Sequence, residues 1–124
     1  MAAAHLISIV DDDPSIRAAL AGLVRSLGHD VRAFASAEEF LASQDIGRFT
    51  CTITDIQMPG MSGFELKHQL HLRHGAVPVI MITARTEPDL EQKALSSGAA
   101  CFLRKPFEAE AFVGCLAKAL GHQA

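Results

Sequence analysis

Hydrophobic and polar positions divide the chain into two kinds of segment that alternate. Short apolar or β-branched runs fall at five places: residues 6–10, about 30–34, 51–55, 77–82 and 99–103. Between and after these runs, apolar residues recur three or four positions apart, which is the spacing of one helix face. The pattern therefore predicts a strand followed by a helix, repeated along the whole chain.

Capping signals locate the beginnings of the first three helices. Asp13 is expected to cap the first helix, with Pro14 at the first helical position, where a missing N–H costs little. Ser-x-x-Glu capping boxes at 36–39 and 62–65 predict the second and third helices. We expect the second helix to run to about residues 45–47.

Fewer apolar residues support the fourth helix than the others. It is expected over residues 86–97, with Thr86 as its cap. Its predicted inward side chains are Leu90, Ala94 and Leu95. Such thin apolar anchoring predicts an element of low local stability.

Strands that are apolar throughout and alternate with helices are typical of an α/β fold, a parallel sheet with helices on both faces. The 124 residues fit one domain of this kind. The carboxyl ends of parallel strands share one edge of the sheet, which is where ligands bind in such folds. That edge should receive polar residues from four segments: Asp11 and Asp12, Asp55, Thr83, and Lys105.

The residues at this edge fit phosphoryl transfer. Three carboxylates crowded together repel one another and favour protonation or a bound divalent ion. Because no His or Cys joins them, a hard cation such as Mg²⁺ suits the site. Thr83 and Lys105 would supply a hydroxyl donor and a positive charge for a phosphoryl group, with Asp55 as the oxygen nucleophile. The predicted product is an aspartyl phosphate.

The formal net charge of −3 comes from the acidic residues near this edge. With residues 11–13 and Asp55 set aside, 10 of the 14 acidic residues remain against 11 basic ones. The chain has no basic stripe and no Trp or Tyr, which argues against direct nucleic-acid binding by this segment. It has no secretory signal and no apolar run long enough to cross a bilayer, so we expect a cytoplasmic protein without a membrane segment.

Neither the cysteines nor the clustered histidines match a known site pattern. The chain has three cysteines: Cys51, Cys101 and Cys115. An odd number without Cys-x-x-Cys spacing or a secretory signal predicts buried or semi-buried thiols. The histidines at 68, 71 and 74 partly share a helix face, but nothing is spaced to complete a metal site. We expect that face to be solvated.

Four motifs together resemble the receiver domain of bacterial two-component response regulators. They are Val-Asp-Asp-Asp-Pro (10–14), Thr-Asp-Ile-Gln-Met-Pro-Gly-Met-Ser-Gly (54–63), Ile-Thr-Ala (82–84) and Phe-Leu-Arg-Lys-Pro-Phe (102–107). They span almost the whole chain in the family's order and spacing. The wording of the second and fourth motifs is most similar to the FixJ/NarL-like transcription regulators.

The resemblance implies a fold, a partner and an output. The fold would be the flavodoxin-like (βα)₅ receiver fold over residues 1–124, with sheet order 2-1-3-4-5 and the output domain absent or removed. A sensor histidine kinase would phosphorylate Asp55. The output would be regulation of transcription through a domain outside this chain.

The resemblance also implies roles for individual residues at the metal site. Asp12 and Asp55 would bind Mg²⁺ directly, and Asp11 would act mainly through water. The backbone carbonyl of Gln57 would complete the protein ligands.

Other residues would bind the phosphoryl group and pass on its arrival. Thr83 and Lys105 would bind the phosphoryl oxygens, and the peptide bond before Pro106 would be cis. Phe102 would be the rotameric switch, filling space that Thr83 leaves. The fourth helix, fifth strand and fifth helix would then form a surface for a phosphorylation-dependent homodimer.

Two alternatives to this function can be weighed against the sequence. A phosphatase with an aspartyl nucleophile commonly needs a second carboxylate two residues later, where this chain has Gln57. We therefore expect no enzyme activity beyond the chain's own phosphorylation and dephosphorylation. The other alternative is a stand-alone receiver or an interaction module that works without phosphorylation. Arg85 and Arg104 are less usual at their positions in the family than the other motif residues.

Overall fold

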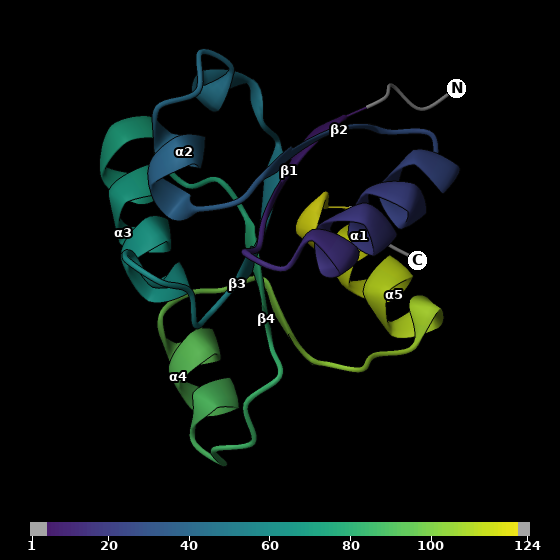
Figure 1. The fold of residues 1–124 in the computed structure, drawn as a ribbon, viewed down its shortest axis with the longest axis vertical. Helices are drawn as coiled ribbons and strands as arrows, with labels where there is room; N and C mark the ends of the chain where they lie inside the picture. The colour runs from purple at the N-terminus through teal and green to yellow at the C-terminus, as the bar shows by residue number, and fades with distance from the viewer. Residues whose placement is uncertain (1–4, 122–124) are drawn as a thin grey trace.

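The computed structural model describes residues 5–121, which form a parallel five-stranded sheet between two helical layers (Figure 1). The strands are β1 (Leu6–Val10), β2 (Asp30–Phe34), β3 (Cys51–Asp55), β4 (Val79–Thr83) and β5 (Cys101–Arg104). Their order is β2-β1-β3-β4-β5, and every neighbouring pair is parallel. The predicted fold class and sheet order are confirmed.

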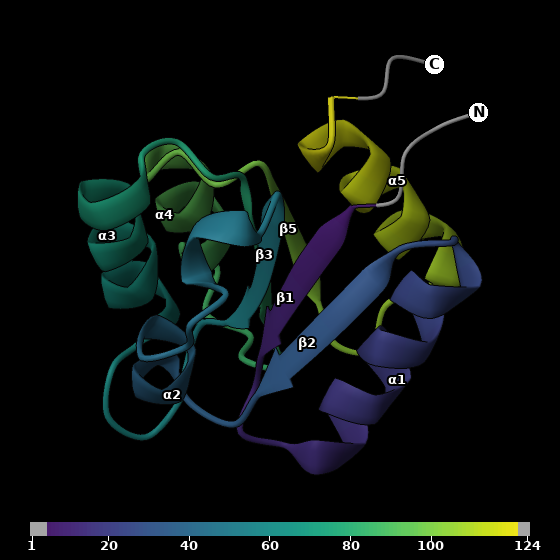
Figure 2. The ribbon, with the colours of Figure 1, turned by 90° about the horizontal axis from the view of Figure 1, so that it is seen from above.

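Helices cover both faces of this sheet. They are α1 (Pro14–Ser26), α2 (Ala37–Leu41), α3 (Gly63–His74), α4 (Leu90–Ser96) and α5 (Ala109–Ala119), with a 3₁₀ turn, η1, at Ile46–Arg48. Figure 2 shows α1 and α5 on one face and α2, α3 and α4 on the other. No helix within residues 5–121 is long and apolar enough to span a membrane.

The two faces of the sheet bury separate hydrophobic clusters. Ile9 of β1 points into the cluster under α1 and α5, and the next residue, Val10, points into the cluster under α2, α3 and α4. Every residue of β3 and β4 is buried, as central strands covered on both faces require.

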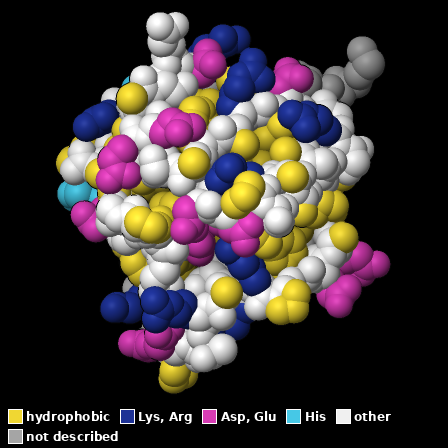
Figure 3. Space-filling view, viewed as in Figure 1, with side chains coloured by type: hydrophobic (Ala, Val, Ile, Leu, Met, Phe, Trp, Pro, Cys, Tyr) yellow, Lys and Arg dark blue, Asp and Glu magenta, His cyan; other side chains and the backbone are white. Residues whose placement is uncertain are grey.

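On the side of the molecular surface seen in Figure 3, basic and acidic side chains are interspersed rather than gathered into a stripe.

The capping signals at Asp13 and Ser62 act as their spacing predicts, while at the 36–39 box one bond of the pair is seen, from the Glu39 N–H to the Ser36 hydroxyl. The Asp13 carboxylate accepts hydrogen bonds from the N–H groups of Ser15 and Ile16, at 2.8 and 3.4 Å. Ser62 and Glu65 form a reciprocal capping box at the start of α3. These bonds satisfy donors that a helix start leaves without partners. They fix where α1 and α3 begin after the strand ends.

Two helices are shorter than predicted. The second ends at Leu41 rather than near residues 45–47, and the Ser43 hydroxyl accepts the N–H of Asp45 in a local turn that competes with the helix. The fourth begins at Leu90 rather than at Thr86. Pro88 explains why residues 86 and 87 are left out, because the residue before a proline disfavours the helical conformation.

Only part of the predicted inward face of α4 points inward. Leu90 and Ala94 are buried, but Leu95 is 47% exposed, so its predicted inward position is wrong. The helix spans seven residues, Leu90–Ser96. It therefore rests on even less apolar contact than the sequence predicts.

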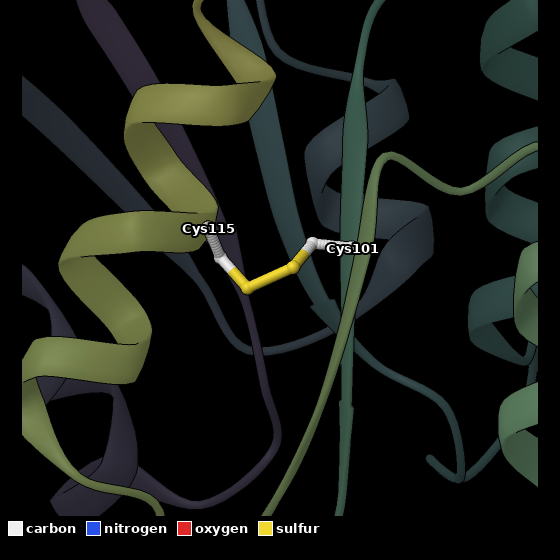
Figure 4. Close-up of a disulfide and its surroundings, with 2 residues drawn as sticks. All are labelled: Cys101 and Cys115. Carbon is white, nitrogen blue, oxygen red and sulfur yellow. A yellow bond between two sulfur atoms is a disulfide. The ribbon is translucent and has the colours of Figure 1, made fainter. Parts of the chain in front are cut away.

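The prediction of three free thiols is wrong for two of the cysteines. Cys101 of β5 and Cys115 of α5 form a disulfide whose Cα atoms lie 5.7 Å apart (Figure 4). The sequence prediction failed because the pairing depends on where α5 packs against the sheet. Cys51 remains a free, buried thiol, and burial raises its pKa to about 12.

Candidate functional site

The carboxyl ends of four strands bring the predicted site residues to one edge. Asp11 directly follows β1, Asp55 ends β3, and Thr83 ends β4. Lys105 directly follows β5, and its backbone N–H donates to the Thr83 carbonyl at 2.7 Å. Parallel pairing alone therefore assembles the site from segments up to 94 residues apart.

Three carboxylates form a cluster at this edge. Asp11, Asp12 and Asp55 each place one oxygen within 4.8 Å of the others. Asp11 is fully buried and Asp55 is 7% exposed, while Asp12 is exposed. The cluster is thus buried at Asp11 and Asp55 and open to solvent at Asp12. Oxygen ligands in this arrangement could hold a hard divalent cation.

Lys105 lies between two of these carboxylates. Its Nζ is 2.9 Å from Asp11 Oδ2 and 3.6 Å from Asp55 Oδ2, and its side chain is 14% exposed. Burial lowers the pKa of Lys105, but the hydrogen bond that Lys105 donates to Asp11 and the negative charges of Asp55 and Asp11 outweigh it and raise the pKa. The ammonium group therefore stays charged beside Asp55.

The carboxyl of Asp55 is harder to ionise than an ordinary aspartic acid. Burial, helped by the charges of Asp11 and Asp12, raises its pKa to about 6, against the opposing effects of Lys105 and the Ile56 N–H. Negative charge is thus concentrated where the protein solvates it poorly. A cation bound by these oxygens would relieve that cost.

The Thr83 hydroxyl is occupied by protein partners in this structure. It donates to Gln57 Oε1 at 3.3 Å and accepts the backbone N–H of Arg85 at 3.0 Å. These residues, with Asp55 and Ala84, line a cavity of about 260 Å³. The cavity places the hydroxyl and the Asp55 carboxyl on the walls of one space.

The structure also places the remaining predicted residues. Phe102 on β5 is partly buried and packs against the core cluster under α2, α3 and α4. The Lys105–Pro106 peptide bond is cis. The resemblance assigned Gln57 a role through its backbone carbonyl, and the structure adds the side-chain bond to Thr83.

Gly63 is a site residue that the sequence motif contained without explaining. A Cβ at this position would lie 2.5 Å from the Asp55 carbonyl oxygen and 3.0 Å from the Ile56 Cα. Real Cβ atoms do not approach backbone so closely, so only glycine lets α3 begin against the end of β3. Its place in the motif is thus explained by packing next to Asp55.

Two arginines make contacts that sequence reasoning missed. Arg17 of α1 donates to the Asp11 carbonyl at 2.8 Å. Arg104 donates to the carbonyls of Arg85 and Glu87, at 2.6 and 3.1 Å. The one available signal was the unusual arginine before Lys105. Which carbonyls it would reach depends on the loop conformation, which no spacing rule predicts.

Comparison with known proteins agrees with this geometry. The family model of the response regulator receiver domain matches residues 7–117. The response regulator protein TodT of Pseudomonas putida is 38% identical over 117 residues, covering 94% of this chain and 52% of TodT. The transcriptional regulatory protein FixJ of Azorhizobium caulinodans is 38% identical over 119 residues, covering 95% of this chain and 56% of FixJ.

A solved structure agrees as well. The response regulator receiver protein from Burkholderia phymatum has a TM-score of 0.83 and 38% identity, with 97% of this chain and 98% of that one covered. The chain spans about half the length of the curated relatives it matches. The likeness therefore concerns their receiver portion.

Proposed function

The chain belongs to the response regulator receiver family, and from that premise we propose that it is a switch activated by phosphorylation of Asp55. A sensor histidine kinase would supply the phosphoryl group in the cytoplasm. The observation that carries this proposal is the placement of Asp55, which lies 3.6 Å from Lys105 and within the acidic cluster. A nucleophile, a positive charge and metal-binding oxygens thus meet at one point.

The acidic cluster is the proposed Mg²⁺ site. Asp11, Asp12 and Asp55 offer only oxygen ligands, and the Gln57 backbone carbonyl belongs to the second residue after Asp55. When bound, Mg²⁺ would neutralise charge on the carboxylates and on the incoming phosphoryl oxygens. This chain's residues would supply the nucleophile and the remaining contacts.

Phosphoryl transfer would use three side chains. An Asp55 carboxylate oxygen attacks phosphorus, and the bond from phosphorus to the nitrogen of the kinase's phosphohistidine breaks as the new P–O bond forms. Lys105 would move its ammonium group toward the phosphoryl oxygens. Thr83 would turn its hydroxyl from Gln57 to the same oxygens.

The proposed output is a change in the surface formed by α4, β5 and α5. The thin anchoring of α4 suits such a change, because few buried contacts must be lost. Homodimerisation through this surface would act on transcription through an output domain outside the chain. The longer relatives, which include a protein named as a transcriptional regulator, support this part of the proposal.

Enzyme activity beyond the chain's own phosphorylation cycle is not part of the proposal. Gln57 stands where an aspartyl phosphatase would carry its second carboxylate. The side-chain oxygen of Gln57 instead accepts a hydrogen bond from the Thr83 hydroxyl. An interaction module that works without phosphorylation remains the second candidate. It is favoured only if Asp55 takes up no phosphoryl group.

Incubation with acetyl phosphate and Mg²⁺ tests the proposal without a kinase. We expect intact-mass spectra to show a gain of one phosphoryl group on the wild type, reversed by hydroxylamine and prevented by EDTA. Asp55→Asn should show no gain. Asp13→Asn is the matched control, because this neighbouring carboxylate caps α1 and should leave the gain unchanged. An equal gain on Asp55→Asn would refute the proposed acceptor.

A further inference from the structure

Arg104 ties β5 to the loop that follows β4. Its Nη1 donates to the Arg85 carbonyl at 2.6 Å, and its Nη2 donates to the Glu87 carbonyl at 3.1 Å. Its guanidinium carbon also lies 5.1 Å from the centre of the Phe102 ring. One side chain thus contacts both the loop and the aromatic residue expected to move.

The loop that Arg104 contacts also holds the Thr83 hydroxyl. The backbone N–H of Arg85 donates to Thr83 Oγ1 at 3.0 Å, and the carbonyl of the same residue accepts from Arg104. The Glu87 carbonyl additionally accepts the N–H of Leu90, the first residue of α4, at 3.3 Å. The guanidinium is therefore linked in one direction to the site and in the other to α4.

We propose that Arg104 is a positioning residue that latches residues 85–87 and Phe102 in the resting arrangement and so limits how readily Thr83 turns toward the phosphoryl group. This inference rests on the proposed function. In the resting arrangement, the Arg85 N–H and Gln57 occupy the Thr83 hydroxyl. Release of residues 85–87 would free the Thr83 hydroxyl from the Arg85 N–H.

The chemistry of the contacts suits a latch. Hydrogen bonds from a charged donor are stronger than neutral ones, and the planar guanidinium fork aims two donors at once. The ring contact adds a cation–π interaction. Movement of Phe102 into space left by Thr83 would break that interaction, so the guanidinium opposes both halves of the expected rearrangement.

A latch and a simple structural brace predict opposite effects on rate. Suppose that the arrangement in which Thr83 can bind the phosphoryl group is a minor state. Removing a contact made only in the major state then raises the population of the minor state and speeds the reaction. If Arg104 merely supports the site, its removal disorders Thr83 and slows the reaction. The direction of the change therefore distinguishes the two roles.

Arg104→Ala tests the latch by two measurements. We expect phosphorylation of Asp55 by acetyl phosphate and Mg²⁺ to be about 5-fold faster or more, since couplings of this kind start near that size. We also expect faster hydrogen exchange at the backbone N–H groups of residues 84–87, 89 and 90 in the unphosphorylated protein. Arg104→Lys, which keeps the charge but loses the fork, should fall between the alanine variant and the wild type.

Arg48→Ala is the matched control, because Arg48 is an exposed arginine that pairs with the nearby Asp45, at 3.2 Å. It should change neither measurement. A rate for Arg104→Ala equal to or below that of the wild type would overturn the latch. Unchanged hydrogen exchange at the Arg85 amide would also overturn it, and this measurement does not depend on phosphorylation. Failure of the wild type to take up a phosphoryl group would count against the proposed function, not against the latch contacts.

Discussion

Asp55 is buried among like charges, which makes its ionisation a property of the whole site. Its pKa is raised to about 6 by burial and by its acidic neighbours. Lys105 offsets this only in part, because it is shared with Asp11 at 2.9 Å. The metal-free site is therefore destabilised when Asp55 is charged, which favours binding of a cation.

The raised pKa of Asp55 predicts how stability depends on pH when no metal is bound. An unfolded chain ionises Asp55 near its ordinary pKa of about 3.9, but the folded chain does so near 6. The folded state thus holds the proton more tightly, so the contribution of Asp55 to stability is greatest below about pH 4 and is lost as the pH rises through about 6. Asp55→Asn cannot ionise and should escape this fall.

Urea denaturation in EDTA, from pH 4 to pH 8, measures the effect. The stability advantage of Asp55→Asn over the wild type should be small at pH 4, grow between pH 4 and 6, and stay constant above pH 7. Asp13→Asn, a change at a helix cap outside the cluster, should show no such growth. An advantage for Asp55→Asn that is the same at every pH would contradict the assigned shift.

Individual site residues were predictable where a strand end fixes their position. Asp55, Thr83 and Lys105 each sit at the carboxyl end of a strand, so parallel pairing alone brings them together. The bond from Thr83 to Gln57 and the reach of Arg104 were not predictable. They depend on side-chain rotamers and loop conformation, which leave no periodic signal in the sequence.

At the scale of elements, α4 and α5 are anchored in different ways. α4 rests on the buried residues Leu90 and Ala94. α5 buries Phe112 and Leu116 and is also joined to β5 by the disulfide from Cys115. Movement within the α4–β5–α5 surface should therefore be concentrated in α4 and the loop before it, where Arg104 acts.

Reduction of the disulfide should destabilise the domain. Cys101 and Cys115 are 14 residues apart, and cross-linking a loop of that size contributes about 3 kcal/mol by limiting the unfolded chain. Dithiothreitol should lower the urea midpoint of the wild type accordingly. The double variant Cys101→Ala/Cys115→Ala should not respond, although it retains Cys51.

Thiol counting under denaturing conditions gives the covalent check. Before reduction one thiol, that of Cys51, should react with an alkylating reagent, and all three should react afterwards. Three reactive thiols before reduction in freshly purified protein would contradict the disulfide.

Element boundaries were predicted well at capping boxes and poorly at local turns. Ser62 and Glu65 fix the start of α3 through paired hydrogen bonds, and such pairs are visible in a sequence. The start of α4 was misplaced because Thr86 looks like a cap, while Pro88 prevents the helix from including it. Tertiary packing of α5, which decides the cysteine pairing, has no local signal at all.

At the scale of the whole molecule, the strand order gives the proposed reaction a route to a distant surface. The order β2-β1-β3-β4-β5 places Asp55 of β3 beside β4, and β4 beside β5. In the proposed function, a change at Asp55 would pass through Thr83 and the β4–α4 loop to the edge of the sheet that carries α4 and α5. The alternation of strands and helices was enough to predict this architecture, because right-handed crossovers leave few other arrangements. The sheet order itself came from the family resemblance.

The central claim is that the phosphoryl group is carried by Asp55, and locating it on the chain tests that claim most directly. Borohydride reduces an acyl phosphate to an alcohol with release of phosphate, so phosphorylated Asp55 would become homoserine. After treatment with acetyl phosphate, Mg²⁺ and borohydride, peptide sequencing by mass spectrometry should find homoserine at position 55 and aspartate at positions 11, 12 and 13. Homoserine at any of those three positions, or aspartate alone at position 55, would contradict the account.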